Sequence, residues 1–254
     1  MRKYLLLILI VLVSGSFVTA DNSVNMYPKI YHPMDFTGGS DGNDYWDLMF
    51  APVGWSKDGK FAYLTEIDPG GAWYDVTGFF RWVIQDTVTD KILWQSEGGL
   101  EKGLPEDLLM SEDKVEILKW VFPNMSKRYQ PYFKKYGIIL NPNLKLSSFP
   151  LKFKRSNYQA SIIDVYRETI YEIPDLISKY KLTVFRNNVK KVVSQYNNNH
   201  SGLMDVQIAG YIKSPYEPLI AIALVDVYRG WEGPPNPVGF RFIGCHLEKG
   251  FKAP

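Results

Sequence analysis

Residues 50–63 read FAPVGWSKDGKFAY and carry the most strongly patterned stretch of the chain. Two apolar segments flank Lys57-Asp58-Gly59-Lys60. An Asp-Gly pair between two apolar runs is typical of a tight β-hairpin turn. We therefore expect a hairpin here, with one strand on each side of the turn.

A second hairpin is predicted over residues 79–94, which read FFRWVIQDTVTDKILW. Side chains alternate between the two faces of a strand, so Phe80, Trp82 and Ile84 share one face. Phe79, Arg81, Val83 and Gln85 share the other face, and we expect at least one of the two faces to be buried. The turn falls at residues 87–90.

The last fifty residues echo the opening stretch. Gly210-Tyr211 is followed by Lys213, a turn and an apolar run, just as Gly54-Trp55 is followed by Lys57, a turn and an apolar run. The echo indicates two similar β-units that flank the middle of the chain.

The middle of the chain changes to helical spacing. Apolar residues recur every three or four positions, and we predict a helical insert at about 103–137 that ends at Gly137. Pro131 within this segment predicts a kink or a helix that starts late. A second, short helix is expected at about 174–178.

The first twenty residues have the features of a signal peptide. Arg2 and Lys3 precede an apolar run over residues 4–13, and small residues occupy the positions before a cleavage site after Ala20. The run is about half of the ~20 residues that a membrane span needs. We expect cleavage after Ala20, an extracytoplasmic location (periplasmic or secreted), and no membrane span in the mature protein.

Composition points to one large folded domain without a nucleic-acid partner. The chain of 254 residues is 46% hydrophobic and has a formal charge of +2, which falls to 0 when Arg2 and Lys3 are removed. A neutral chain exerts no general attraction on nucleic acids or anionic membranes. We predict a single β-rich α+β domain at 21–254, with antiparallel hairpins in propeller-like or sandwich-like sheets and the helical insertion at 103–137.

Two short resemblances accompany this pattern. Residues 54–63 (GWSKDGKFAY) resemble a blade strand and turn of TolB-type β-propellers, and residues 83–94 (VIQDTVTDKILW) are similar to blades of quinoprotein-type propellers. Together they cover one blade, residues 53–95. The order of signal peptide, these hairpins and ALVDVYRGWEGP at 223–234 resembles a group of predicted secreted bacterial proteins of unknown function. This resemblance implies export and a β-rich fold, and it carries no catalytic residues.

Paired carboxylates form one candidate site. Asp58, Glu66 and Asp75 lie close in sequence to Trp73 and Tyr74, a composition found where two carboxyl groups flank a glycosidic bond. The alternative function is therefore a hydrolase that acts on envelope polymers or glycans. Asp58 is equally well explained by its turn.

Aromatic residues beside turns form the other candidate site. Trp73, Tyr74 and Trp231 are the predicted ligand-binding residues, and Trp55 and Tyr211 lie in similar positions. Exposed aromatic rings next to polar loops suit a glycan or protein ligand. The sequence thus favours a non-catalytic binding or structural module of the cell envelope.

The sequence contains no complete motif for binding a metal or a cofactor. The acidic loop at 41–47 lacks the central glycine and final glutamate of a calcium loop, and Cys245-His246-Leu247-Glu248 would need His32 or His200 to complete a zinc site. No phosphate loop, dinucleotide motif or serine elbow is present, so we expect no metal and no cofactor. The single cysteine, Cys245, cannot form an internal disulfide and is predicted to be buried.

Overall fold

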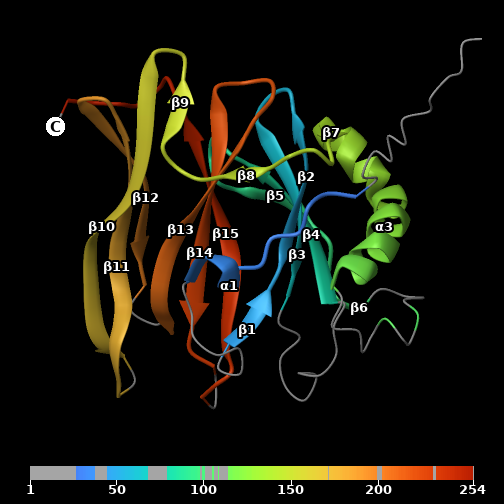
Figure 1. Cartoon of the computed structure of the whole chain (residues 1–254), viewed down its shortest axis with the longest axis horizontal. Helices are drawn as coiled ribbons and strands as arrows, with labels where there is room; N and C mark the ends of the chain where they lie inside the picture. The colour runs from blue at the N-terminus through green and yellow to red at the C-terminus, as the bar shows by residue number, and fades with distance from the viewer. Residues whose placement is uncertain are drawn as a thin grey trace, which may run out of the picture.

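The computed structural model describes residues 27–37, 45–67, 79–97, 99–100, 105, 108, 114–170, 172–198, 202–230 and 233–253. These residues form a β-rich structure of antiparallel sheets, as the sequence predicts. A short helix, α1 (Met34–Thr37), precedes the strands, and α3 (Lys114–Tyr136) lies within the segment expected to be helical. In Figure 1, α3 flanks one sheet, and two further sheets follow on the side away from the helix.

The first sheet has the strand order β5-β4-β3-β2-β7, with β6 also paired to β4. Both predicted hairpins are present: Trp55 lies opposite Phe61 in one and Ile84 opposite Trp94 in the other. The strands are β2 (Phe50–Ser56), β3 (Lys60–Glu66), β4 (Phe79–Asp86), β5 (Ile92–Gln95), β6 (Gly99–Leu100) and β7 (Ile138–Leu140).

The turn between β2 and β3 is held by its own side chains. The Ser56 hydroxyl donates a hydrogen bond to Asp58 Oδ1 (2.6 Å) and accepts one from the Lys60 backbone N–H (2.7 Å). Gly59 has φ +90°, in the left-handed region that favours glycine. The Asp-Gly pair therefore acts as the sequence predicts.

The second sheet has the order β1-β15-β14-β13-β8, and β1 runs parallel to β15 while the other pairs are antiparallel. Its strands are β1 (Tyr45–Leu48), β8 (Leu146–Ser147), β13 (Leu203–Lys213), β14 (Leu219–Tyr228) and β15 (Asn236–His246). Every residue of β14 from Leu219 to Val227 is buried, so this strand is covered on both faces.

The third sheet has the order β12-β11-β10-β9. Its strands are β9 (Leu151–Phe153), β10 (Ser156–Ile170), β11 (Ile173–Arg186) and β12 (Val189–Asn197). The short helix expected at 174–178 is wrong, because these residues begin β11. Leu176 and Ile177 are buried there and pair with β10, so burial and cross-strand pairing override the local helical tendency.

Three hydrophobic cores hold these elements in four layers. Trp82 and Ile84 of the first sheet pack with Ile117 and Leu118 of α3, which confirms that at least one face of β4 is buried. The other face of the first sheet packs on the second sheet, and the second sheet packs on the third. Along β14, Ala221, Ala223 and Val225 face the first sheet, while Ile220, Ile222 and Leu224 face the third.

Helix α3 continues through two prolines. Pro123 and Pro131 both lie inside the helix on its exposed side, so a start after Pro131 is wrong. Phe122 and Phe133 pack on Trp82 with ring centroids 5.6 and 5.4 Å away, and this packing outweighs the backbone hydrogen bonds that proline removes. The segment ends at Gly137, which has φ +68° as a helix-ending glycine should.

The two sequence echoes share a structural feature. Gly54 and Gly210 each lie at a register shift, and each meets a short antiparallel strand, β7 or β8. A Cβ atom on Gly54 would lie 2.4 Å from the Ile139 carbonyl oxygen, and one on Gly210 would lie 2.3 Å from the Ser147 carbonyl oxygen. In both units, glycine is what lets the neighbouring backbone approach this closely.

Candidate functional site

The structure describes two of the predicted site residues, Asp58 and Glu66. The others lie outside the described residues: Asp75, Trp73, Tyr74 and Trp231.

Asp58 has a structural role in the β2–β3 turn. Its carboxylate accepts a hydrogen bond from the Ser56 hydroxyl and forms an ion pair with Lys60. The hydrogen bond from Lys60, followed by that from Ser56, lowers the pKa of Asp58 below its ordinary value. Its side chain is 68% exposed. A general acid needs a raised pKa, so this environment does not suit that role.

Glu66 lies at the opposite end of β3 from Asp58. It is buried, and its Oε2 accepts a long hydrogen bond from the Met49 backbone N–H (3.4 Å). The seven residues of β3, at about 3.3 Å each, place the two ends of its backbone about 20 Å apart, with Asp58 before one end and Glu66 at the other. Glycosidase pairs lie about 5 to 9.5 Å apart, so the structure does not bring Asp58 and Glu66 together as a catalytic pair.

Two aromatic residues beside the glycines belong to the interior. Trp55 is fully buried and packs on Phe61 with ring centroids 4.9 Å apart, so its inclusion among the surface aromatics is wrong. Its side chain belongs to the core between the first and second sheets. Tyr211 is partly buried and packs on Phe149 at 5.0 Å.

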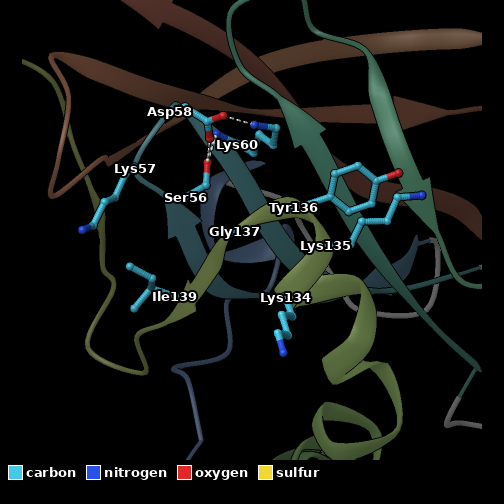
Figure 2. Close-up of a pocket in the computed structure, with 9 residues that line it drawn as sticks. All are labelled: Ser56, Lys57, Asp58, Lys60, Lys134, Lys135, Tyr136, Gly137 and Ile139. Atoms are coloured by element: carbon cyan, nitrogen blue, oxygen red, sulfur yellow. Dashed lines mark hydrogen bonds and ion pairs between the residues drawn. The ribbon is translucent and has the colours of Figure 1, made fainter.

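A positively charged hollow lies where the β2–β3 turn meets the end of α3 (Figure 2). We call it the lysine pocket. Its volume is about 450 Å³, and its lining is Ser56, Lys57, Asp58, Lys60, Lys134, Lys135, Tyr136, Gly137 and Ile139. Four lysines against one aspartate give it a net formal charge of +3. Lys57, Lys134 and Lys135 are exposed.

An aromatic surface begins at the same pocket. We call it the aromatic ledge, made of Trp94 on β5 and Tyr129, Tyr132 and Tyr136 on α3. The Trp94 and Tyr132 rings stack with centroids 4.3 Å apart and an interplanar angle of 19°, and Tyr132 is 40% exposed. The Tyr136 hydroxyl donates a hydrogen bond to the Leu93 carbonyl (3.0 Å), which fixes the helix end against β5.

Sequence reasoning missed the aromatic ledge for a definable reason. Tyr129, Tyr132 and Tyr136 follow the helical spacing that predicts a buried face. The structure buries Phe133 and packs Tyr129 and Tyr136 partly against the core, while Tyr132 lies at its margin. The distinguishing signal is the phenolic hydroxyl, because tyrosine keeps a polar tip at a wet boundary where phenylalanine does not.

A charge pair within the second sheet is linked to the third sheet by a hydrogen bond. Asp226, which is 2% exposed, accepts hydrogen bonds from Arg241 Nε (2.6 Å) and Nη2 (3.0 Å). Arg241 also donates to the Tyr180 hydroxyl. Burial raises the pKa of both Tyr180 and Tyr228, so these phenols stay neutral at ordinary pH. The cluster is satisfied internally, and we assign it a structural role.

Cys245 and its neighbours do not form a reactive or metal-binding group. Cys245 is buried, as predicted, and burial raises the pKa of its thiol to about 11. Glu248 forms an ion pair with Lys154, and its backbone N–H donates to His246 Nδ1 (3.1 Å). Across the described ranges, no three His, Cys, Asp or Glu side chains gather as a metal site requires.

Comparison with known proteins gives no further identification. The chain matches no protein-family model, no curated protein and no solved structure. Within the part of the chain that the structure describes, no helix combines the length and the hydrophobicity needed to cross a bilayer.

Proposed function

We propose that the protein is an exported, non-catalytic binding module of the cell envelope that holds a glycan on the aromatic ledge. The observation that carries this proposal is the stack of Trp94 on Tyr132 at 4.3 Å, with Tyr132 left 40% exposed. Rigid aromatic rings offer a large contact area at a small cost in side-chain entropy.

Tyr132 is not needed to complete the core beneath α3, whereas Trp94, Tyr129 and Tyr136 pack partly against that core. Phe122 and Phe133 of the same helix already cover Trp82, with centroids 5.6 and 5.4 Å away. Tyr132 lies outside that contact and stacks on the edge strand β5 instead. Exposed aromatic rings with phenolic tips match the apolar faces and hydroxyl edges of sugar rings.

In this proposal, the rest of the chain is the scaffold that holds the aromatic ledge. We propose that the stacked sheets form a sandwich-like scaffold and that the segment at 103–137 is a helical insert that presents the ledge. Export follows from the signal-peptide pattern, and N-terminal sequencing of the mature protein should give Asp21 as the first residue. A different first residue would refute the assigned cleavage site.

The binding proposal is tested by replacing one exposed ring. Tyr132→Ala should weaken retardation in native gels that contain dextran, soluble chitin oligomers or extracted envelope polysaccharide by about two- to tenfold, the range of one stacking contact. Tyr216→Ala is the matched control, because Tyr216 is 41% exposed and lies in the turn between β13 and β14. Equal retardation of the two variants, or no retardation of the wild type by any of these glycans, would overturn the proposal.

A further inference from the structure

We infer that the lysine pocket is an anion-binding subsite of the aromatic ledge, so that the glycan selected is an acidic polysaccharide. This inference rests on the proposed function and adds the chemical class of the ligand. Three observations support it: the lysines come from two separate elements, the pocket shares Tyr136 with the ledge, and the lysine side chains point in different directions.

The lysines come from two separate elements. Lys134 and Lys135 occupy the last turn of α3, where cations compensate the helix dipole. The β2–β3 hairpin brings Lys57 and Lys60 to the same hollow. Lys60 is paired with Asp58, and neither that pair nor the helix dipole explains Lys57. The helix end contributes about −0.5 charge, which is small against the +3 of the pocket. The pocket therefore stays positive.

The pocket and the ledge are one continuous surface. Tyr136 belongs to both, since it lines the pocket and is hydrogen-bonded to β5 beside Trp94. Tyr132 and Tyr136 are about 6 Å apart along the helix, or about one turn. Lys135 Nζ also lies 5.2 Å from the centre of the Tyr136 ring. A chain molecule lying on Tyr132 would reach the lysines within this distance.

The directions of the lysines favour a polymer over a small anion. In Figure 2, Lys57, Lys134 and Lys135 extend in different directions around Gly137 and do not converge on one point. Lysine is a flexible point charge that does not impose the fixed fork geometry of arginine. Such an arrangement suits acidic groups spaced along a chain better than a single phosphate or sulfate ion.

The overall charge argues against a nucleic acid or an anionic membrane as the occupant. The full chain carries a formal charge of +2, and 0 once Arg2 and Lys3 are removed. The positive charge is thus local, and at physiological salt its field is screened beyond about 8 Å. The aromatic ledge beside it provides the short-range contacts that a sugar chain can use.

The test compares a neutral and a charged form of one polymer. The exported protein is titrated by calorimetry with dextran, dextran sulfate and polygalacturonate. The variant Lys57→Gln/Lys134→Gln removes two charges from the pocket, and Lys152→Gln/Lys190→Gln removes two exposed charges from the third sheet as the control. We expect both acidic polymers to bind at least about tenfold more tightly than dextran, and the pocket variant to lose about tenfold for the acidic polymers alone.

Each outcome bears on one proposal. The acidic subsite is overturned if dextran and the acidic polymers bind equally, or if the two lysine variants lose the same affinity. The aromatic ledge is then judged separately by Tyr132→Ala. Unchanged glycan binding in Tyr132→Ala overturns the proposal that the aromatic ledge binds the glycan. Anion binding by the lysine pocket is then judged from the two lysine variants alone. If anionic phospholipid vesicles or single-stranded DNA compete as strongly as polygalacturonate, the assignment to a polysaccharide is overturned.

Discussion

Replacing Gly54 or Gly210 by alanine should destabilise the protein far more than an ordinary strand substitution. A Cβ at position 54 would lie 2.4 Å from the Ile139 carbonyl oxygen, whereas real Cβ atoms keep at least 3.0 Å. The obstructing atoms are backbone, so no side chain can rotate away. Strand β7 must shift outward, and its pairing with β2 weakens.

The size of the effect follows from the geometry. Overpacking in a rigid site costs about 1 to 3 kcal/mol, and we expect Gly54→Ala to lower the free energy of unfolding by about 2 kcal/mol. Gly210 faces the Ser147 carbonyl at 2.3 Å and also has φ +151°, which L side chains rarely adopt. Gly210→Ala should therefore cost about 1 kcal/mol more than Gly54→Ala.

Urea unfolding followed by tryptophan fluorescence measures these changes as shifts in the midpoint. Gly239→Ala is the control, because its Cβ would meet Leu48 at an ordinary 3.7 Å. That variant should change the free energy of unfolding by less than about 0.5 kcal/mol. If Gly54→Ala were as stable as Gly239→Ala, the close approach of β7 and the relation between the two β-units would both be refuted.

Three further predictions concern titratable groups. Asp226→Ala should lower the free energy of unfolding by about 2 to 3 kcal/mol, because it leaves Arg241 without its buried partner. Cys245, with a thiol pKa of about 11, should react with Ellman's reagent at pH 8 about a thousandfold more slowly than an exposed thiolate. Burial, followed by the charges of Lys249 and Lys191, lowers the pKa of His246 below its ordinary 6.5, and NMR titration should place its midpoint there. The folded state disfavours the protonated ring, so His246 should make the protein less stable as pH falls below about 6.5.

Each of these has its own control. Asp164→Asn removes the charge of an exposed pair with Lys181 and keeps a residue that tolerates the φ of 52° at this position. It should cost less than about 1 kcal/mol, so an equal cost for Asp226→Ala would contradict the buried-pair argument. Cys245 should label rapidly in urea, and rapid labelling of the native protein would show that the thiol is not enclosed. Lys249→Gln should move the His246 midpoint upward, and a downward move would exclude the assigned charge effect.

The hairpins could be predicted from the sequence because the residues that specify them are adjacent in the chain. Asp58-Gly59 specifies a turn by its own backbone preferences, and the alternation around Trp82 predicts that at least one face is buried. The start of β11 was not readable, because Leu176 and Ile177 gain their stability from a partner strand. Local propensity carries no information about that partner.

The aromatic ledge and the lysine pocket could not be predicted from the sequence for a related reason. Trp94 comes from an edge strand and Tyr132 from a helix, and each looks like an ordinary core residue in its own segment. The lysine pocket likewise joins a hairpin turn to a helix end. The sequence placed Lys57 and Lys134 in these elements, and their meeting depends on how α3 docks on the first sheet.

The short connection after α3 ties the first sheet to the second. Gly137 leads directly into β7 in the first sheet, and the same chain reaches β8 in the second sheet by Leu146. The two sheets are thus joined at one margin by a short covalent connection, each end of which is hydrogen-bonded into one sheet, as well as by their shared core. Sliding of one sheet over the other would therefore require β7 or β8 to detach from its sheet.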